Sequence, residues 1–421
     1  MASTTPPSPT RTTSTSSPTM RKPKRSLSLS LLLFLFSFLA LSFLLFILCF
    51  DLRILCFFPN SSIPIPPPPP PPPLLNPKPP QSSHLYPRPA HGLRARPKSP
   101  RQTLLLKSLR PNPRSRRFPT RATEFLRGSS PNPRFFMTWL SPADEFGPRE
   151  RFAVQALFRS HKNATLLIAS DSLDSPRGAR LLGPFVAAGL RVAAMCPSFP
   201  FLLAGTPAAP WFDRLRRGSV DPGDVPLAQN LSNLLRLLLL YKFGGVYVDA
   251  DVLVLRSFAR LRNAIGAQTL DPATGSWSRL NNAVMVFDKM HPLLYEFLKE
   301  FAETFDGRKW GHNGPYLVSR VVTRVLAERS RGLGSGFGLS ILPPSAFYPV
   351  DWSRVSGFFK GPQNGAHLKW VVNKLSWIRR ESFAVHLWNR ESRGIRVEEG
   401  SIIGRIISDF CLFCNFSVSD L

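Results

Sequence analysis

The sequence predicts an α/β domain with a mostly parallel sheet, placed behind a membrane anchor and a proline-rich spacer. The sheet is indicated by short apolar runs that alternate with segments of helical spacing from Arg134 onward. The anchor is indicated by one long uncharged run near the N-terminus, and the spacer by the prolines and arginines behind it. Strands that alternate with helices favour parallel pairing and right-handed crossovers. Such sheets bind ligands beyond the carboxyl ends of their strands.

The uncharged run covers residues 26–50 and is rich in Leu and Phe. A helix of this length rises roughly 37 Å, enough to cross a hydrocarbon core of about 30 Å. Four basic residues precede the run, whereas only Arg53, offset by Asp51, follows it closely. The positive-inside rule therefore predicts a cytosolic tail at 1–25, a transmembrane anchor and a lumenal remainder. A plastid transit peptide is the alternative, because residues 2–20 are rich in Ser and Thr and lack acids.

The segment 51–133 is predicted to be a disordered stem rich in proline and arginine. Its eight consecutive prolines at 66–73 favour the extended polyproline II conformation. Residues 52–123 contain no acid, so much of the net charge of +28 lies here. A basic disordered segment can bind nucleic acid by counterion release, but a solvated spacer is the better interpretation behind a membrane span. The folded domain is expected over 134–421.

Within that domain, the pattern predicts strands separated by helices. Strands are predicted at 135–139, 164–169, 190–195 and 246–255, where apolar runs of strand length occur. Helices are predicted at 149–161, 178–189 and 226–243. The last of these helices is apolar almost all round, which indicates a place in the core, and Gly244 and Gly245 end it.

Cysteines and glycosylation sequons give weaker guidance. The five cysteines show no zinc-finger spacing. In an oxidising lumen, Cys196 could pair with a C-terminal cysteine, or Cys411 with Cys414, and the sequence leaves both pairings open. Four sequons, which accept glycans only in a lumenal domain, occur at Asn60, Asn163, Asn230 and Asn415.

The chemistry is predicted at Asp249 and Asp251, which lie within the apolar strand at 246–255. Residues two apart in a strand point to the same face, so the two carboxylates are expected side by side. Two like charges in partial burial repel each other unless a cation lies between them. Such oxygen ligands suit Mg²⁺ or Mn²⁺, which also take up diphosphate oxygens. An Asp-x-Asp in a solvated turn is the alternative, which the flanking apolar residues disfavour.

Four segments together resemble the DXD-containing α-1,4-glycosyltransferases, the family that includes lactosylceramide α-1,4-galactosyltransferases. The segments lie at 232–251, which ends in Gly-Gly-Val-Tyr-Val-Asp-Ala-Asp, and at 280–287, 310–315 and 384–389. The resemblance implies a GT-A type, Rossmann-like nucleotide-sugar domain and a reaction that retains anomeric configuration. Two residues depart from the family pattern. Asn233 stands where members often have Asp, and Gln155 stands where many have Glu, and either change could alter donor choice.

The resemblance also implies the roles of the site residues. Asp249 would contact the nucleotide ribose or the metal, Asp251 would ligate the metal, and Asn281 would hydrogen-bond the donor sugar. His386 would be the third metal ligand, with His312 as the competing candidate. Further substrate-binding residues are expected at Trp139, Arg236, Tyr247, Asn282, Trp310, His312, Asn313, Gly314 and Trp388.

Each of these roles has a structural alternative. His386 could be a hydrogen-bonded core histidine, and strand capping explains Asn281 nearly as well as a catalytic role does. Arg236 could simply extend its charge to solvent from an apolar helix. Core packing is the usual fate of tryptophan, which applies to Trp310 and Trp388.

The expected activity is transfer of a hexose, of galactose type, from a UDP-sugar to a glycan or glycolipid acceptor. Mn²⁺ or Mg²⁺ would be the cofactor, and the enzyme would be a single-pass type II protein of the Golgi membrane that binds no nucleic acid. Assembly into Golgi homo- or hetero-oligomers stays open. A non-catalytic sugar-binding or scaffold protein on the same fold is the alternative, and it predicts a degraded aspartate pair. A nucleic-acid-binding protein would instead carry its basic charge on the folded domain.

Overall fold

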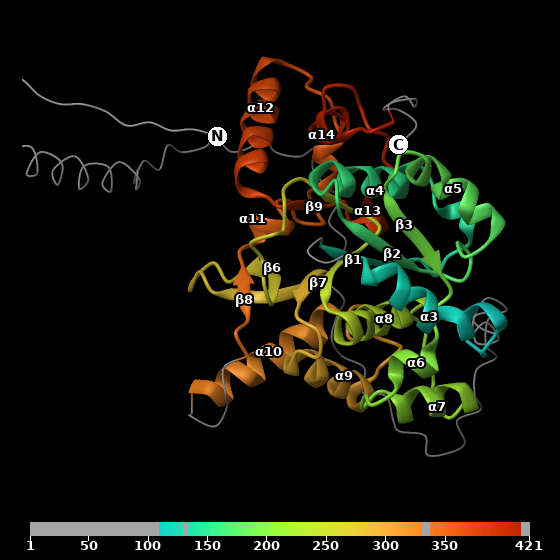
Figure 1. Cartoon of the computed structure of the whole chain (residues 1–421). Helices are drawn as coiled ribbons and strands as arrows, with labels where there is room; N and C mark the ends of the chain where they lie inside the picture. Colours follow the sequence, from blue (N-terminus) through green and yellow to red (C-terminus); the bar gives the residue numbers. More distant parts are fainter. Residues whose placement is uncertain (1–108, 129–132, 331–336, 414–421) are drawn as a thin grey trace, which may run out of the picture. The chain divides into compact units, whose positions relative to one another are not determined.

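The computed structural model describes residues 109–128, 133–330 and 337–413 (Figure 1). The predicted tail, the predicted anchor and most of the predicted stem lie outside these residues. Among the residues described, no helix has both the length and the apolar character needed to span a membrane.

A seven-stranded sheet lies between two layers of helices, in the strand order β3-β2-β1-β4-β7-β6-β8. Neighbouring strands pair in parallel except in the two pairs that include β7. The prediction of a mostly parallel α/β sheet is therefore confirmed. The strands are β1 (Arg134–Thr138), β2 (Thr165–Ala169), β3 (Arg191–Met195), β4 (Gly245–Val248), β6 (Ala264–Leu270), β7 (Trp277–Phe287) and β8 (Ser340–Leu342).

The strand order reverses between β1 and β4, which makes this point the topological switch of the sheet. From β1 the chain adds β2 and β3 on one side, and it then returns to place β4 on the other side of β1. Phe136 of β1 lies opposite Tyr247 of β4, so the two strands end near each other. Ligands of open α/β sheets bind beyond the strand ends at such a point.

Successive strand residues face opposite helical layers, and this alternation builds the core. Phe136 packs into the layer that contains helix α8 (Leu227–Phe243), whereas Phe135 and Met137 pack into the layer that contains α4 (Pro148–Ser160). The buried, apolar character predicted for α8 is confirmed. The α8 layer also holds α6 (Phe199–Leu203), α7 (Ala209–Arg217), α9 (Pro292–Thr304) and α10 (Pro315–Ser330), and the α4 layer holds α5 (Pro176–Ala187) and α11 (Pro344–Phe347).

Helix α3 (Pro113–Arg127) lies inside the segment predicted to be a disordered stem. Its Phe118 and Ala122 are fully buried in the core beside α8. Arg121 also forms an ion pair with Asp174, at 2.7 Å, beyond the end of β2. The stem prediction is therefore wrong at its C-terminal end, and the folded domain begins by residue 109. The sequence of α3 is rich in arginine, and only a narrow face of the helix is apolar, so its packing against the core was not predicted.

The strand predicted at 246–255 is divided between two sheets. Strand β4 ends at Val248, a turn follows, and β5 (Val252–Val254) pairs antiparallel with β9 (Ala384–His386) in a separate two-stranded sheet. The turn is closed by the N–H of Val252, which donates to the carbonyl of Asp249 at 3.1 Å. The prediction of one continuous strand is wrong, and so is the same-face argument for the two aspartates.

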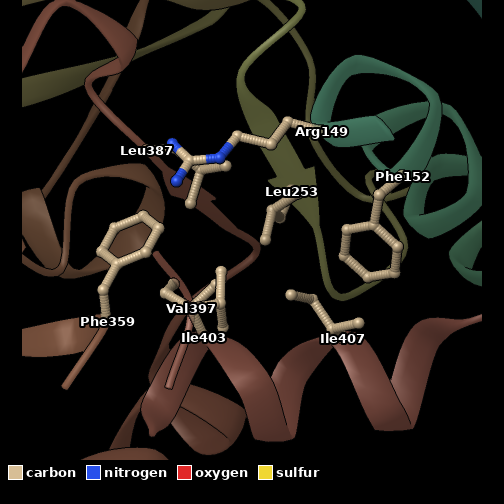
Figure 2. A pocket seen from close by; sticks show the side chains of 8 residues that line it. All are labelled: Arg149, Phe152, Leu253, Phe359, Leu387, Val397, Ile403 and Ile407. Carbon is tan, nitrogen blue, oxygen red and sulfur yellow. The ribbon is translucent and has the colours of Figure 1, made fainter. Parts of the chain in front are cut away.

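One face of the small sheet, with Leu253 and Val385, packs in a third apolar cluster, whereas Val252 and Val254 pack in the cluster of the α4 layer. The third cluster joins β5 and β9 to α4, α12 (Gly365–Glu381) and α14 (Ile402–Phe410). Figure 2 shows its apolar side chains around a small cavity, with the guanidinium of Arg149 reaching over Leu387. Both the third cluster, through Leu387, and Arg149, through Ser392, contact the segment that follows β9.

The cysteines and one sequon also correct the sequence analysis. Cys196 is a free, buried thiol whose pKa is raised by burial to about 12, so of the two pairings left open, the one between Cys196 and a C-terminal cysteine does not form. Cys411 is disulfide-bonded. Asn230 is 2% exposed on α8 and cannot carry a glycan in the folded domain, whereas Asn163 is exposed.

A pH-dependent loss of stability is expected from His161, which caps the C-terminal end of α4. Its Nε2 accepts the N–H of Phe258 at 2.8 Å, and burial lowers its pKa from 6.5 to about 4. The folded state therefore binds the proton less readily than the unfolded state does. The contribution to the free energy of unfolding is fully present above pH 6.5 and decreases as the pH falls toward 4, by up to about 3 kcal/mol.

Urea unfolding at about pH 7 and about pH 5 measures this effect. The variant His161→Gln keeps a hydrogen-bond acceptor but does not titrate, so it is the matched control. The stability advantage of the wild type over the variant should shrink at the lower pH. A difference that stays constant would contradict the assignment to His161.

Candidate metal centre

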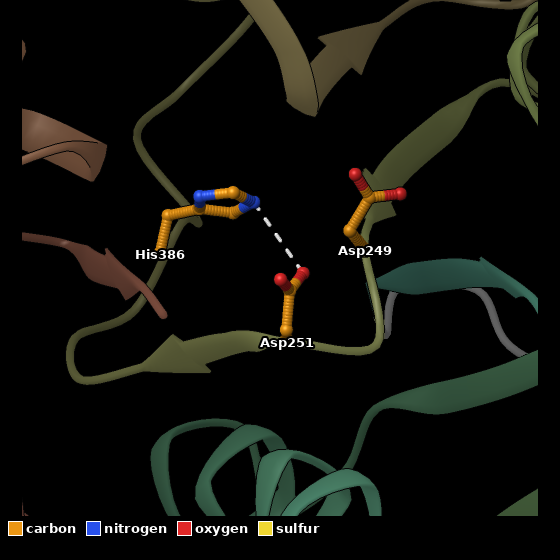
Figure 3. A group of neighbouring side chains, drawn as sticks. All are labelled: Asp249, Asp251 and His386. Carbon is orange, nitrogen blue, oxygen red and sulfur yellow. Dashed lines mark ion pairs between the residues drawn. The ribbon is translucent and has the colours of Figure 1, made fainter. Parts of the chain in front are cut away.

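Asp249, Asp251 and His386 converge at the switch point of the sheet. Each offers one ligand atom, and these atoms all lie within 4.8 Å of one another. Figure 3 shows that Asp249 follows the end of β4, Asp251 precedes β5, and His386 comes from β9. The β5–β9 register places Val252 opposite His386, so the imidazole lies beside the aspartate that precedes Val252. His386 Nε2 is 3.4 Å from Asp251 Oδ1.

Asp251 is held as a carboxylate by two neighbours. Its Oδ2 accepts the backbone N–H of Asn389 at 2.9 Å, and its Oδ1 faces His386. Burial acts to raise the pKa of Asp251, but His386 and the Asn389 N–H outweigh it and hold that pKa at about 2. Asp251 is therefore ionised across the physiological range.

Asp249 has a buried counter-ion, Arg236, supplied by the core helix α8. Arg236 is 1% exposed, and its guanidinium lies 3.0 Å from Asp249 Oδ1. The hydroxyl of the fully buried Tyr247 also donates to Asp249 Oδ1, at 2.7 Å. Burial raises the pKa of Asp249, and Arg236 opposes that rise. Arg236 and Tyr247, both predicted to bind substrate, thus form the support behind Asp249.

These contacts change the argument for a cation. Arg236 offsets the charge of Asp249, and although burial opposes a proton on His386, Asp251 raises the pKa of that imidazole. The sequence analysis inferred a metal from the repulsion between the two carboxylates. In the folded protein that repulsion does not by itself require a metal.

The donor set nevertheless fits a divalent cation. Two carboxylates and one imidazole suit a first-row divalent metal, which would take the place of the proton on His386. His386 Nδ1 is buried and has no hydrogen-bond partner among the described residues.

Asn281 and Asn282 lie inside β7, next to β4, and both are 4% exposed. Asn281 Nδ2 donates to Gln268 Oε1, and Asn282 Nδ2 donates to Asn233 Oδ1, each at 3.0 Å. The carbonyl of Asn282 accepts from Arg236 at 2.6 Å. Both residues are engaged in hydrogen bonds within the protein, and Asn282 also contacts Arg236, the counter-ion of Asp249.

The Gly-rich loop between α9 and α10 is held by hydrogen bonds to α8 and α9. His312 Nε2 pairs with the carbonyl of Thr304 at 2.8 Å, so His312 stands outside the three-residue cluster. Asn313 is 1% exposed and donates to Asn230 Oδ1 at 2.9 Å. Gly314 packs so closely that a Cβ there would lie 2.8 Å from an oxygen of Asn233.

Two predicted substrate residues, Trp139 and Trp388, have their indole nitrogens occupied. Trp139 follows β1, is 7% exposed, and donates Nε1–H to the carbonyl of Pro142 at 3.1 Å. Trp388 donates to the carbonyl of Val350 at 3.0 Å, and its ring lies edge-on to His386 with centroids 4.2 Å apart.

Trp310 differs from the other predicted substrate residues because it is 49% exposed. The guanidinium of Arg390 lies 4.2 Å from the centroid of its ring. Arg390 directly follows Asn389, whose N–H binds Asp251, so Trp310 is connected to the candidate metal centre through this segment.

Two family profiles match consecutive parts of the chain. Residues 147–271 match a glycosyltransferase sugar-binding region containing the DXD motif, and residues 286–418 match the α-1,4-glycosyltransferase conserved region. A lactosylceramide 4-alpha-galactosyltransferase from Pongo pygmaeus is 31% identical over 50% of this chain and 89% of its own length. The chain belongs to the α-1,4-glycosyltransferase family. Its predicted membership of this family of enzymes is thereby confirmed.

Other relatives of this glycosyltransferase extend the comparison. An uncharacterized Arabidopsis thaliana protein is 33% identical over 67% of this chain, which spans only 42% of that protein. A human alpha-1,4-N-acetylglucosaminyltransferase is 25% identical over 50% of this chain and 57% of its own length. Among solved structures, the PaToxG glycosyltransferase aligns with 17% identity and a TM-score of 0.33, over 55% of this chain and 85% of that one.

The sequence analysis did not assign a role to Asn389, which helps to build the site of this glycosyltransferase. Asn389 closes the motif at 384–389, so its place in that motif was an available signal. Gln155, suspected of altering donor choice, instead accepts the N–H groups of Leu412 and Phe413, at 2.8 and 2.9 Å. Gln155 thus holds residues 412–413 against α4 and does not belong to the cluster of Asp249, Asp251 and His386.

Replacing Arg236 with Met should destabilise this glycosyltransferase. The change leaves Asp249 partly buried without its counter-ion, and breaking a buried ion pair from one side costs about 3–5 kcal/mol. Urea unfolding of Arg236→Met measures the loss. The variant Arg390→Met removes an exposed guanidinium and should change stability by less than about 1 kcal/mol. Equal stability of the two variants would contradict the buried role of Arg236.

Proposed function

We propose that this chain transfers a galactose-type sugar, with retention of configuration, from a UDP-sugar to a glycan or glycolipid acceptor. The cluster of Asp249, Asp251 and His386 at the switch point of the sheet carries the proposal. Membership of the α-1,4-glycosyltransferase family supports it. We further propose a Golgi membrane location with type II topology, which rests on the apolar run at 26–50.

The strand arrangement supports a GT-A type domain as the finer fold assignment. The sheet is parallel apart from β7, and the chain leaves it immediately after β4, through the turn that carries both aspartates. This turn places the carboxylates outside the strand ends, where a nucleotide can reach them.

The protein groups divide the chemical work between metal binding and support. A bound Mn²⁺ or Mg²⁺ would stabilise the negative charge that builds on the departing diphosphate. Asp249 and Asp251 would offer oxygen ligands, and His386 a nitrogen ligand. The imidazole favours a transition metal, so Mn²⁺ is the expected choice over Mg²⁺. Arg236 and Asn389 keep the carboxylates in place.

Retention is proposed to proceed by front-face substitution. Both aspartates of the cluster are assigned to the cation, so neither is assigned as a nucleophile. The acceptor hydroxyl would attack from the side on which the diphosphate departs, and the leaving phosphate would accept the hydroxyl proton.

The relatives leave galactose and N-acetylglucosamine as the two donor sugars to compare. Full-length protein in detergent with Mn²⁺, offered UDP-galactose and UDP-N-acetylglucosamine in turn, distinguishes them by release of UDP and by labelled product. Release with UDP-galactose supports the proposal, release with only the other sugar corrects the donor, and no release with either overturns it.

His386→Ala should weaken the binding of Mn²⁺ by at least about 100-fold, because removing a ligand should exceed the 10–100-fold typical of groups that only orient ligands. His312→Ala is the matched control, since His312 belongs to a family motif but pairs with the carbonyl of Thr304. Its affinity for Mn²⁺ should match that of the wild type. Titration calorimetry with Mn²⁺ alone measures both variants. Equal affinities would remove His386 from the metal site.

Trp310→Ala should raise the KM for the acceptor by up to about 10-fold, because stacking on an aromatic face contributes roughly 0.5–1.5 kcal/mol. Hydrolysis of the UDP-sugar by water should continue at the wild-type rate, since Trp310 is outside the cluster of Asp249, Asp251 and His386. Trp370→Ala removes another exposed tryptophan, from α12, and should leave both reactions unchanged. An unchanged acceptor KM in Trp310→Ala would exclude an acceptor role.

A further inference from the structure

The segment that carries His386 is held by two residues that precede it by more than two hundred positions. Arg149 and Glu150 lie in the first turn of α4, and they are 8% and 3% exposed. Their side chains reach residues 389–395, between 239 and 246 positions further along the chain. The segment therefore takes its position from α4 as well as from its own sheet.

Glu150 connects to the metal centre through Asn389. Its Oε1 accepts the side-chain amide of Asn389 at 3.3 Å and also the guanidinium of Arg393. Only the nitrogen of an amide can donate to a carboxylate, so Glu150 fixes which way the Asn389 side chain turns. The backbone N–H of the same Asn389 donates to Asp251 Oδ2 at 2.9 Å. One residue thus separates Glu150 from a metal-binding carboxylate.

Arg149 holds the other end of the segment. Its Nη1 donates to the carbonyl of Ser392 at 2.7 Å, and its Nη2 donates to the carbonyl of Ile395. The guanidinium lies 4.9 Å from the centroid of the Phe359 ring and borders the apolar cavity of Figure 2. Backbone carbonyls are the acceptors here, so Arg149 restrains the path of the chain.

The restrained segment contains a strained residue. Trp388 has φ 54° and ψ 55°, the left-handed conformation that costs a residue with a side chain roughly 1–2 kcal/mol. This turn lets His386, before Trp388, and the N–H of Asn389, after it, both face Asp251. Such strain persists only where surrounding contacts over-determine the conformation.

We propose that Glu150 is a positioning residue for the metal site: by holding the Asn389 side chain and Arg393, it keeps the Asn389 N–H on Asp251 and His386 beside it. The inference rests on the proposed metal role of Asp251 and His386. It assigns Glu150 no contact with the metal or the sugar. Groups that orient metal ligands typically contribute 10–100-fold to metal affinity.

Mn²⁺ titration of the full-length protein in detergent provides the first test. Glu150→Ala should weaken Mn²⁺ binding by about 10-fold or more, and Glu150→Gln, which keeps an oxygen for Asn389, should lose less. Glu300→Ala is the matched control, because Glu300 is also a buried glutamate on a helix, paired with Arg320 and Arg324 at 2.9 and 2.8 Å. The control should lose thermal stability while its Mn²⁺ affinity stays within about twofold of the wild type.

Amide hydrogen exchange without metal provides the second test. Peptides that cover 386–395 should exchange faster in Glu150→Ala than in the wild type, and at the wild-type rate in Glu300→Ala. Unchanged exchange in a folded Glu150→Ala protein, or an equal loss of Mn²⁺ affinity in the control, would overturn the positioning role. A wild-type protein that binds no Mn²⁺ would refute the proposed function instead, and the exchange data would then decide the role of Glu150 alone.

Discussion

The turn from Asp249 to Asp251 is the constraint on which the site depends. It takes the chain from the seven-stranded sheet to the two-stranded sheet, and the carbonyl of Asp249 closes it by accepting the N–H of Val252. Asp249 directly follows the last residue of β4, and Asp251 directly precedes the first residue of β5. Their carboxylates therefore converge only if both sheets are correctly packed. The position of this pair therefore depends on the whole domain.

Each aspartate is supported by a different part of the protein. The core helix α8 places Arg236 against Asp249, at the cost of burying a guanidinium among leucines. The small sheet places His386 beside Asp251, and the turn after it adds the N–H of Asn389. Arg236 carries the charge opposite to that of Asp249, and Asp251 raises the pKa of His386, so the protein's own groups reduce the repulsion between the two carboxylates. A divalent cation would then compete with a proton for the imidazole of His386.

Most polar residues of the family motifs serve this scaffold. Asn281, Asn282, His312 and Asn313 form hydrogen bonds with neighbouring strands, helices and loops. Trp310 remains half exposed. The residues of the family motifs therefore fall into two groups, those that are buried and hydrogen-bonded and those that are exposed to solvent, such as Trp310. Burial distinguishes the two groups, whereas residue type does not.

The sequence by itself determined the alternation of strands and helices, the burial of α8 and the identity of the two aspartates, because periodicity and apolar runs are local properties. It also indicated His386, through a motif near the C-terminus. Only the tertiary structure decided that the predicted strand at 246–255 is broken, that α3 belongs to the domain, and that Arg236, Asn389 and Glu150 support the carboxylates. Those outcomes depend on contacts between residues that are far apart in the chain, which packing sets and local pattern does not encode.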